Sequence, residues 1–445
     1  MILNFSFYLA CTGIHHFIKD ISTEQLLLPQ NFQLTFLSAK VSQTILKRAG
    51  MFGINPKGPS EKDLPDGTHV DAFTKEEILS CYQDYVTACK WFEAAGKIDM
   101  VSMGRQFFAD PAFPNKAKAG HADEIRRCLR CGRCYPGLSG EHETEIWTVK
   151  FPPLDSCTIN PYDVWPASHH KVLPERMPKP EASRKVLVVG GGCGGLQTAI
   201  TAADRGHQVI LCEKAGVLGG LINFTDHTDH KVDIRNFKDL LIRDVEKRPI
   251  KVRLNCEVTP ELIKEIAPEA VVLAVGSDDL ILPIEGIENA VTAMEVYYND
   301  FAGLGKSTIV LGGGLVGCEA AADYIDHGVE TTIVEMKGAL MPETTGLYRT
   351  AVHDFIDKNG GKYEVNAKVI KVGKDFVVAE QNGTEITIKA DSVVNAMGRR
   401  AHATEALEAA IKEAGIPVWK IGDCVRARQI GDAVREGWTA AMEII

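Results

Sequence analysis

The sequence has little that suits a membrane span, a secreted chain or a nucleic-acid surface. No apolar run reaches the roughly 18 residues that a transmembrane helix needs. The N-terminal stretch MILNFSFYLACTGIHHF is mildly apolar, but it lacks the basic region and cleavage site of a secretion signal. A net charge of −10 argues against the clustered Lys and Arg of a nucleic-acid footprint. We therefore expect a cytoplasmic protein that acts on a small molecule. Its oligomeric state stays open, a homo-oligomer included.

The cysteines are too scattered for a disulfide framework. Of the 12 cysteines, four fall within residues 128–157 and the others are spread along the chain. This distribution is typical of a reducing compartment and one metal site. No Cys-x4-Cys redox pair follows the first glycine-rich turn of the sequence, at residues 190–195, which argues against a disulfide reductase.

Residues 185–214, KVLVVGGGCGGLQTAITAADRGHQVILCEK, predict a dinucleotide-binding unit. An apolar strand at 186–189 runs into a Gly-x-Gly-x-x-Gly turn and then an alanine-rich helix. In such a turn the first glycine makes the bend, the second admits a pyrophosphate and the third lets the helix pack on the strand. A second strand ends at Glu213, where it can accept hydrogen bonds from an adenosine ribose. The three glycines are Gly190, Gly192 and Gly195.

The same unit occurs a second time, at residues 307–337. Its first glycine and its terminal acid, Gly312 and Glu335, are 23 positions apart, as are Gly190 and Glu213. Each unit is followed by an apolar strand that leads to a glycine, at Gly276 and Gly398. Two units of one geometry predict two bound nucleotides. The second unit's glycines are Gly312, Gly314 and Gly317.

Three closely spaced cysteines and one distant cysteine predict a metal centre. Cys128, Cys131 and Cys134 follow one another at i+3 spacing, and Cys157 comes later. Three close thiolates and one remote thiolate favour an iron–sulfur cluster. Structural zinc is the alternative, because C-x2-C thiolates serve it equally well. Four arginines surround the triplet and would either offset thiolate charge or form a solvated face: Arg126, Arg127, Arg130 and Arg133.

Two further glycine-containing pairs suit phosphate or flavin contacts. Gly104 and Arg105 end a short strand predicted to begin at Lys97, where backbone N–H groups and a guanidinium can hold a phosphate. An ordinary strand-to-helix turn is the alternative there. Gly422 and Asp423 end a strand before a helix predicted to begin near Ile430. An aspartate at this point can accept a flavin ribityl hydroxyl.

These motifs resemble a known group of flavoproteins. VVGGGCGGL, LCEK, GGL, AVGS, LGGGLVGCEAA, NAMGR and IGDC occur in the order typical of a two-dinucleotide flavoprotein reductase. Upstream, SMGRQFFADPAFPNKAKAG, RRCLRCGRC and CTINP resemble the long members of the old yellow enzyme family. That group includes 2,4-dienoyl-CoA reductase, 2-enoate reductase and bile-acid enoyl oxidoreductase. The resemblance runs from about residue 70 to the end, and it implies an FMN-bearing barrel, a [4Fe–4S] cluster and an FAD/NAD module.

The resemblance also implies a role for each matching residue. Gly104 and Arg105 correspond to the FMN phosphate turn. An acid rather than an arginine at Glu335 favours NADH over NADPH. The implied cluster ligands are Cys128, Cys131, Cys134 and Cys157. The implied FAD contacts are Gly190, Gly192, Gly195, Glu213, Gly220 and Asp423. Gly276 and Gly422 are further predicted cofactor-binding residues. The implied nicotinamide-cofactor contacts are Gly312, Gly314, Gly317 and Glu335.

The expected fold is α/β, with an incomplete (β/α)8 barrel followed by a cluster loop and two nested doubly wound domains. We expect a barrel remnant at 1–120 and the cluster loop and linker at 121–182. The FAD domain is predicted at 183–303 and 390–445, and the NAD(P)H domain at 304–389. A complete barrel takes about 200 residues or more, whereas about 120 precede the cluster here. We therefore expect either a truncated or internally deleted barrel or a remnant that pairs with another segment, and in each case little FMN bound.

The resemblance implies an oxidoreductase in which electrons pass from NADH to FAD, the [4Fe–4S] cluster and FMN. The final acceptor would be an activated C=C bond of the enoate or enoyl-CoA type. A deleted barrel leaves an alternative: a diaphorase-type NADH:acceptor reductase without enoyl reduction. The sequence identifies neither the proton donor nor the substrate.

Overall fold

The computed structural model describes residues 105–131, 133, 157–161, 177, 179–342, 344 and 346–445. The chain divides into two compact units, Met1–Phe107 with Pro111–Ile125, and Phe108–Asp110 with Arg126–Ile445. Most of the predicted barrel remnant, including Gly104 and the strand at 97–104, lies outside the described residues. Within the part of the chain that is described, no helix is long and apolar enough to cross a membrane.

The described part of the first unit is short and helical. Helix α6 (Arg105–Ala109) is followed by α7 (Phe113–Ala119), which has a proline in its first turn and ends at Gly120 in a left-handed conformation. A 3-10 turn, η4 (Ala122–Glu124), comes next. Phe113 packs against Ile125, and the Lys116 ammonium donates to the Glu124 carbonyl at 3.0 Å.

The second unit contains a five-stranded sheet of order β15-β4-β1-β2-β3 in which every pair is parallel. Its central strand β1 is apolar and buried from Val186 to Val189, as is usual where helices cover both faces of a parallel sheet. The predicted first strand and the strand before Glu213 are thereby confirmed. The strands are β1 (Lys185–Val189), β2 (Gln208–Cys212), β3 (Ile250–Arg253), β4 (Ala270–Leu273) and β15 (Val418–Lys420).

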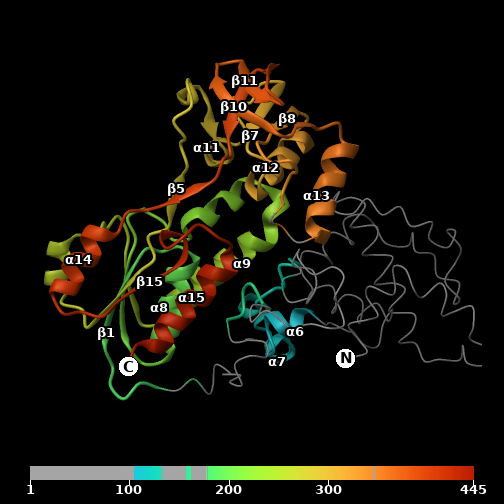
Figure 1. Ribbon diagram of the computed structural model, residues 1–445. Coiled ribbons are helices and arrows are strands. Elements are labelled where there is room, and N and C mark those ends of the chain that lie inside the picture. The colour runs from blue at the N-terminus through green and yellow to red at the C-terminus, as the bar shows by residue number, and fades with distance from the viewer. Residues whose placement is uncertain are drawn as a thin grey trace, which may run out of the picture. The chain divides into compact units, whose positions relative to one another are not determined.

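Helices cover both faces of this sheet. On one face α8 (Cys193–Asp204) lies beside α15 (Ile430–Glu443), and α9 (Val232–Glu246) packs next to α8 (Figure 1). The other face carries α10 (Pro260–Ile266) and α14 (Glu405–Glu413). Two 3-10 segments, η6 (Gly220–His227) and η7 (Asp229–Lys231), lead into α9. The C-terminal helix α15 thus packs against the helix that follows the first glycine turn.

A second five-stranded parallel sheet has the order β6-β13-β7-β8-β9. An antiparallel three-stranded sheet packs on it through Val377 and Ala379, which contact Ile309 and Leu311. The parallel strands are β6 (Val291–Thr292), β7 (Ser307–Leu311), β8 (Glu330–Val334), β9 (Lys362–Glu364) and β13 (Ser392–Asn395). The antiparallel strands are β10 (Ala367–Val372), β11 (Phe376–Gln381) and β12 (Thr384–Lys389). The helices are α11 (Ala293–Tyr298), η8 (Ile287–Asn289), α12 (Leu315–Asp326) and α13 (Gly346–Lys358).

The nested domains and their limits at 304 and 389 stay predictions, and the second sheet extends beyond that range. Strands β6 and β13 lie outside that range, yet both pair within the second sheet. The chain enters and leaves this domain through β5 (Ser277–Asp279) and β14 (Arg399–Ala401), which form an antiparallel pair. The second domain therefore occupies the stretch between these two strands. The described residues confirm the α/β architecture, and they do not test the barrel.

Candidate functional site

The first glycine turn is closed on one side and open on the other. A β-carbon on residue 195 would lie 1.9 Å from the Gly190 carbonyl oxygen, and one on residue 190 would lie 2.3 Å from the carbonyl oxygen of Ala274. A β-carbon on residue 192 would meet nothing within 4 Å. Gly192 is also the N-cap of α8. The turn therefore packs tightly on β1 and β4, and it offers a helix N-terminus with open space in front of it, where an anion is favoured.

The second glycine turn has the same geometry. A β-carbon on residue 317 would lie 1.9 Å from the Gly312 oxygen, and residue 314 again faces open space. Gly314 is the N-cap of α12. In both sheets the central strand leads to the turn, and the strand order reverses beside it. Ligands of open parallel sheets bind at such switch points, beyond the carboxyl ends of the strands.

The two strand-ending acids, Glu213 and Glu335, brace the glycine turns. Each side chain is 7% exposed and accepts backbone N–H groups on both carboxylate oxygens, at 2.6 and 2.7 Å. Both carboxylates therefore hold their glycine turns in place. Each carboxylate oxygen also keeps a further lone pair for the predicted hydrogen bond from a ribose hydroxyl. The donors are Gly191 and Ala215 for Glu213, and Gly313 and Lys337 for Glu335.

Gly220 and Asp423 both lie next to the first turn. A β-carbon on residue 220 would lie 2.9 Å from the Gly192 α-carbon. A β-carbon on residue 194, in the first turn of α8, would lie 3.5 Å from the side chain of Ile421, which precedes Asp423 by two positions. Burial, and then the negative charge of Asp423, raise the pKa of the Cys193 thiol to about 12. The structure therefore brings together three sequence motifs that are far apart in the chain.

The Asp423 carboxylate is held by two further contacts. It accepts the Ser277 hydroxyl at 3.1 Å and the Arg428 backbone N–H at 3.1 Å. Ser277 follows Gly276, just after β4, and Asp423 comes just after β15. Because β4 and β15 are adjacent parallel strands, these two predicted cofactor-binding positions meet at the same edge of the sheet. The Gly422 N–H donates to Glu436 of α15 at 2.7 Å. These contacts fix the turn that precedes α15.

Sequence reasoning missed a polar contact between the two dinucleotide domains. The Lys231 ammonium lies 2.7 Å from the Glu319 carboxylate of α12, which also accepts the Tyr348 hydroxyl. Burial lowers the pKa of Lys231, but Glu319 and Tyr348 outweigh that effect and leave it raised. The signal available in the sequence was Glu319, a charged residue within the alanine-rich helix that begins at Leu315.

A second missed contact lies beside the first. The Tyr297 hydroxyl donates to the buried Asp323 carboxylate at 2.6 Å, and the Thr228 hydroxyl lies 3.3 Å from it. Burial, and then Asp323, raise the pKa of Tyr297, which keeps the hydroxyl a donor. Thr228 precedes η7 of the first domain, whereas Tyr297 and Asp323 belong to the second.

Three of the four predicted cysteine ligands are described, and Cys134 lies outside the described residues. Burial raises the pKa of the Cys157 thiol to about 11; the backbone N–H groups of Ile159 and Asn160 act in the opposite direction, and Cys128 and Cys131 add to the rise. No three His, Cys, Asp or Glu side chains among the described residues are gathered into a metal site.

The donors around these thiols suit an iron–sulfur centre. The backbone N–H of Arg130 donates to the Cys128 sulfur at 3.3 Å, and the Cys131 sulfur lies 3.1 Å from the Thr158 hydroxyl. Two of the predicted ligands, Cys128 and Cys131, therefore have a hydrogen-bonding neighbour at sulfur. Such contacts stabilise thiolate sulfur and tune cluster potentials. The residues present fit the predicted centre.

The neighbouring arginines pair with acids of the FAD-domain helices. The Arg130 Nε donates to Asp233 of α9 at 2.8 Å. Arg133 donates to Asp432 of α15 at 2.8 Å. These contacts tie the cysteine loop to the helices that surround the first glycine turn.

The chain is similar to proteins named as oxidases and reductases. It is 34% identical over 357 residues to an NADH oxidase of Thermoanaerobacter brockii, covering 79% of this chain and 52% of the relative. It is 34% identical over 308 residues to a cinnamate reductase of Clostridium sporogenes, covering 68% and 44%. The chain therefore spans about half the length of the curated relatives it matches.

Solved structures and a family model agree with these relatives. A 2-naphthoyl-CoA reductase complexed with 2-naphthoyl-CoA superposes with a TM-score of 0.70 at 26% identity, over 80% of this chain and 52% of the other. The model of the pyridine nucleotide-disulphide oxidoreductases matches residues 184–437, more than half of the 445 residues. Both glycine turns lie inside that match, and this chain therefore belongs to the pyridine nucleotide-disulphide oxidoreductase family.

Proposed function

We propose that this chain is an NADH-dependent flavoprotein oxidoreductase that reduces an activated C=C bond of a small molecule, of the enoate or enoyl-CoA type. The observation that carries the proposal is the pair of glycine turns with one geometry. Each turn is packed at its third glycine, open at its second, and placed at a helix N-terminus. The family match supports flavin at one turn and NADH at the other.

The first turn is the proposed FAD site. The N-terminus of α8 and the open space at Gly192 suit the pyrophosphate. Gly220 backs that space, and Asp423 offers a carboxylate to a flavin hydroxyl. Glu213 keeps the turn in shape and presents its remaining lone pairs to the adenosine ribose.

The second turn is the proposed NADH site. The N-terminus of α12 and the open space at Gly314 suit the second pyrophosphate. The Glu335 carboxylate at the end of β8 favours a free ribose hydroxyl and would repel the 2′-phosphate of NADPH. This preference of Glu335 for a free ribose hydroxyl is the basis for proposing NADH rather than NADPH.

The cysteines are proposed to hold a [4Fe–4S] cluster, with Cys128, Cys131, Cys134 and Cys157 as ligands. When bound, NADH, FAD, the cluster and FMN supply hydride and single-electron transfer in that order. Gly104 and Arg105 remain the proposed FMN phosphate turn. Within the chain itself, the Arg130 backbone N–H donates to the Cys128 sulfur, and the Thr158 hydroxyl lies at hydrogen-bond distance from the Cys131 sulfur.

The proposed substrate class depends on the relatives' names. Cinnamate reductase and 2-naphthoyl-CoA reductase are named for an unsaturated carboxylate and an aromatic thioester. A second candidate function is a diaphorase-type NADH:acceptor reductase. It is favoured by the similarity to a protein named NADH oxidase, and by the fact that both proposed nucleotide sites lie in one compact unit.

A cofactor inventory of the anaerobically purified chain tests the proposal. We expect about one FAD and about four iron and four sulfide per chain, with FMN low. NADH added without oxygen should bleach the flavin absorbance. Zinc in place of iron would overturn the cluster, and a colourless protein indifferent to NADH would overturn the whole proposal. NADH-dependent consumption of cinnamate would favour the reductase of an activated C=C bond. NADH-dependent reduction of a dye without consumption of cinnamate would favour the diaphorase-type reductase.

A further inference from the structure

Arg399 lies where the chain leaves the second domain, and it contacts the strand by which the chain enters that domain. Strand β14 begins at Arg399 and pairs antiparallel with β5, where Arg399 stands opposite Asp279. The Arg399 Nη1 donates to the Asp279 carboxylate at 2.5 Å. Its Nε donates to the Ser277 hydroxyl oxygen at 3.0 Å, and its Nη2 donates to the Ser277 carbonyl. All three nitrogens of the guanidinium therefore bind β5.

The Ser277 hydroxyl links Arg399 to Asp423. A hydroxyl has one proton to donate and two lone pairs that accept. Because the Arg399 Nε donates to the oxygen, the Ser277 proton is left for an acceptor, and Asp423 Oδ2 lies 3.1 Å away. The other Asp423 oxygen accepts the Arg428 backbone N–H at 3.1 Å. Two consecutive hydrogen bonds thus connect Arg399 with the proposed flavin contact.

The guanidinium fixes the direction of the Ser277 hydroxyl. A serine side chain has three staggered positions about its Cα–Cβ bond. Only 14% of the Arg399 side chain is exposed, and its ion pair with Asp279 holds it on β5. Without this donor the Ser277 hydroxyl can adopt another rotamer, in which its proton no longer faces Asp423. The Asp423 carboxylate would then lose one of the two donors that orient it.

Arginine suits this position better than lysine. Its planar fork can reach a carboxylate, a hydroxyl and a carbonyl at once, whereas an ammonium is a compact point charge. A largely buried cation also needs several acceptors to offset the loss of water. We therefore expect Arg399→Lys to keep the ion pair with Asp279 and to lose the hydrogen bond from Nε to Ser277.

Arg400 is the matched control on the same strand. Successive side chains of a strand point to opposite faces. Arg400 is exposed and stands opposite Asp278, whereas Arg399 stands opposite Asp279. Substituting Arg400 therefore removes the same charge from β14 without changing the contact with Ser277.

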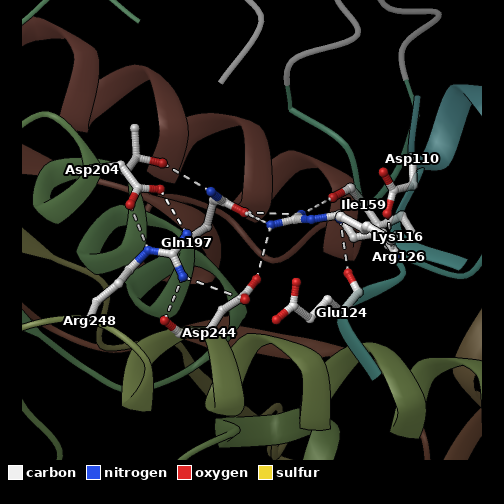
Figure 2. Close-up of polar contacts among 10 residues, drawn as sticks. Asp110, Lys116, Glu124, Arg126, Ile159, Gln197, Asp204, Asp244 and Arg248 are labelled. Atoms are coloured by element: carbon white, nitrogen blue, oxygen red, sulfur yellow. Dashed lines mark hydrogen bonds and ion pairs between the residues drawn. The ribbon is translucent and has the colours of Figure 1, made fainter. Parts of the chain in front are cut away.

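Arg248 is the control for the loss of a paired arginine elsewhere in the FAD domain. Its Nε and Nη2 donate to Asp204 at 2.7 and 2.9 Å, and its Nη1 lies 3.5 Å from the Asp244 carboxylate (Figure 2). Asp204 is the last residue of α8, at the opposite end of that helix from Gly192. A change at Arg248 therefore removes an ion pair and leaves the Asp423 contacts unchanged.

We propose that Arg399 is a positioning residue for the flavin site: through the Ser277 hydroxyl, it orients the Asp423 carboxylate toward the flavin hydroxyl. The inference rests on the proposed function, in which Asp423 contacts FAD. Arg399 and Ser277 belong to the two strands through which the chain passes between the domains. Retention of FAD therefore depends on the pairing of β5 with β14 as well as on the first glycine turn.

The test measures how fast FAD leaves the loaded full chain after dilution, followed by the rise of flavin fluorescence. We expect Arg399→Gln and Ser277→Ala each to release FAD about tenfold faster than wild type, because a charged acceptor loses a hydrogen bond. The double variant should be no faster than about the same tenfold, since both changes break one chain of contacts. Ser277→Thr keeps the hydroxyl and should match wild type.

The other variants separate positioning from stability. Arg399→Lys should release FAD at a rate between those of wild type and Arg399→Gln. Arg400→Gln and Arg248→Gln should release it as wild type does, even where the unfolding temperature falls. The visible circular dichroism of the bound flavin should change in Arg399→Gln and stay as in wild type in both controls.

Equal release rates in Arg399→Gln and wild type would overturn the inference. Additive effects in the double variant would overturn it too, because Arg399 would then act independently of Ser277. If Arg399→Gln retains no FAD, Arg399→Lys and the pair Ser277→Ala and Ser277→Thr decide by the same rates. A wild-type release rate in Asp423→Asn would remove the inference and leave FAD binding intact, whereas a wild-type chain without flavin would overturn the proposed function and the inference together.

Discussion

Gly195 lies directly against the backbone of Gly190, because a β-carbon on residue 195 would come within 1.9 Å of the Gly190 carbonyl oxygen. Gly317 stands in the same relation to Gly312. Substituting alanine must therefore push the helix away from its turn. We expect Gly195→Ala to lose bound FAD. We expect Gly317→Ala to keep FAD, but its KM for NADH should rise at least about tenfold, which corresponds to about 1.4 kcal/mol of binding free energy.

The two variants serve as controls for each other. Flavin content by absorbance and NADH oxidation with an artificial acceptor measure the two effects separately. If Gly195→Ala kept FAD at the wild-type level, the first turn would not be the flavin site. Loss of FAD in Gly317→Ala would show that the two sites are not independent.

The Glu335 carboxylate accepts the backbone N–H groups of Gly313 and Lys337 at 2.6 and 2.7 Å. In Glu335→Gln an amide NH2 would face one of these donors and lose its hydrogen bond, at a cost of about 1.5–3 kcal/mol for a charged acceptor. We expect KM for NADH to rise and the preference for NADH over NADPH to narrow, because the negative charge that repels a 2′-phosphate is gone.

Steady-state KM values for both nucleotides check this prediction. Glu213→Gln is the matched variant, since it makes the same change in the first turn. It should weaken FAD binding and leave the ratio of the KM values for NADH and NADPH near that of wild type. An unchanged ratio in Glu335→Gln would contradict the proposed placement of the ribose.

The Tyr297 hydroxyl and the Asp323 carboxylate form a buried hydrogen bond of 2.6 Å, with both residues 2% exposed. Tyr297→Phe leaves the buried carboxylate short of a donor, which costs about 1–3 kcal/mol. We expect a lower unfolding temperature by calorimetry. Tyr298→Phe is the control, because that neighbour in α11 is 45% exposed and should change the temperature little. Equal temperatures for both variants would count against a structural role for the contact.

The glycine spacing was enough to predict both nucleotide units. The turns at Gly190 and Gly312, the strands that lead to them, and the strand before Asp423 are all where the sequence predicted them. These features are local, because a turn with little room for side chains needs glycine at fixed positions. The order of the motifs also predicted that one domain is nested in the other, and this stays a prediction.

Contacts between distant segments could not be predicted. Strand β6 is two residues long, so no alternation of apolar residues marks it, and its pairing with β13 joins segments about 100 positions apart. The Lys231–Glu319 pair joins residues from different domains and has no local pattern. The Arg126 contact with Ile159 is equally non-local. The predictions at Gly104 and Cys134 lie outside the residues that the structure describes.

Asp391 ties the start of β7 to β13, and its contribution should depend on pH. Its carboxylate accepts the Lys306 and Ser307 backbone N–H groups at 2.8 and 3.0 Å. These two N–H groups, that of Lys306 first, lower the pKa of Asp391. A depressed pKa means that the ionised form is preferred in the folded state. The stabilisation is therefore complete above the ordinary aspartate value of about 3.9 and is lost as pH falls through the folded pKa.

The comparison of wild type with Asp391→Asn tests this. We expect wild type to unfold at a higher temperature at pH 7 and at pH 5, and the difference to shrink as the pH is lowered below about 4. Asp375→Asn is the control, because that side chain is exposed at the turn between β10 and β11 of the same domain. A difference that stays constant down to the lowest pH at which the chain folds would show that the Asp391 charge does not stabilise the strand start, and the hydrogen bonds alone would then account for the effect.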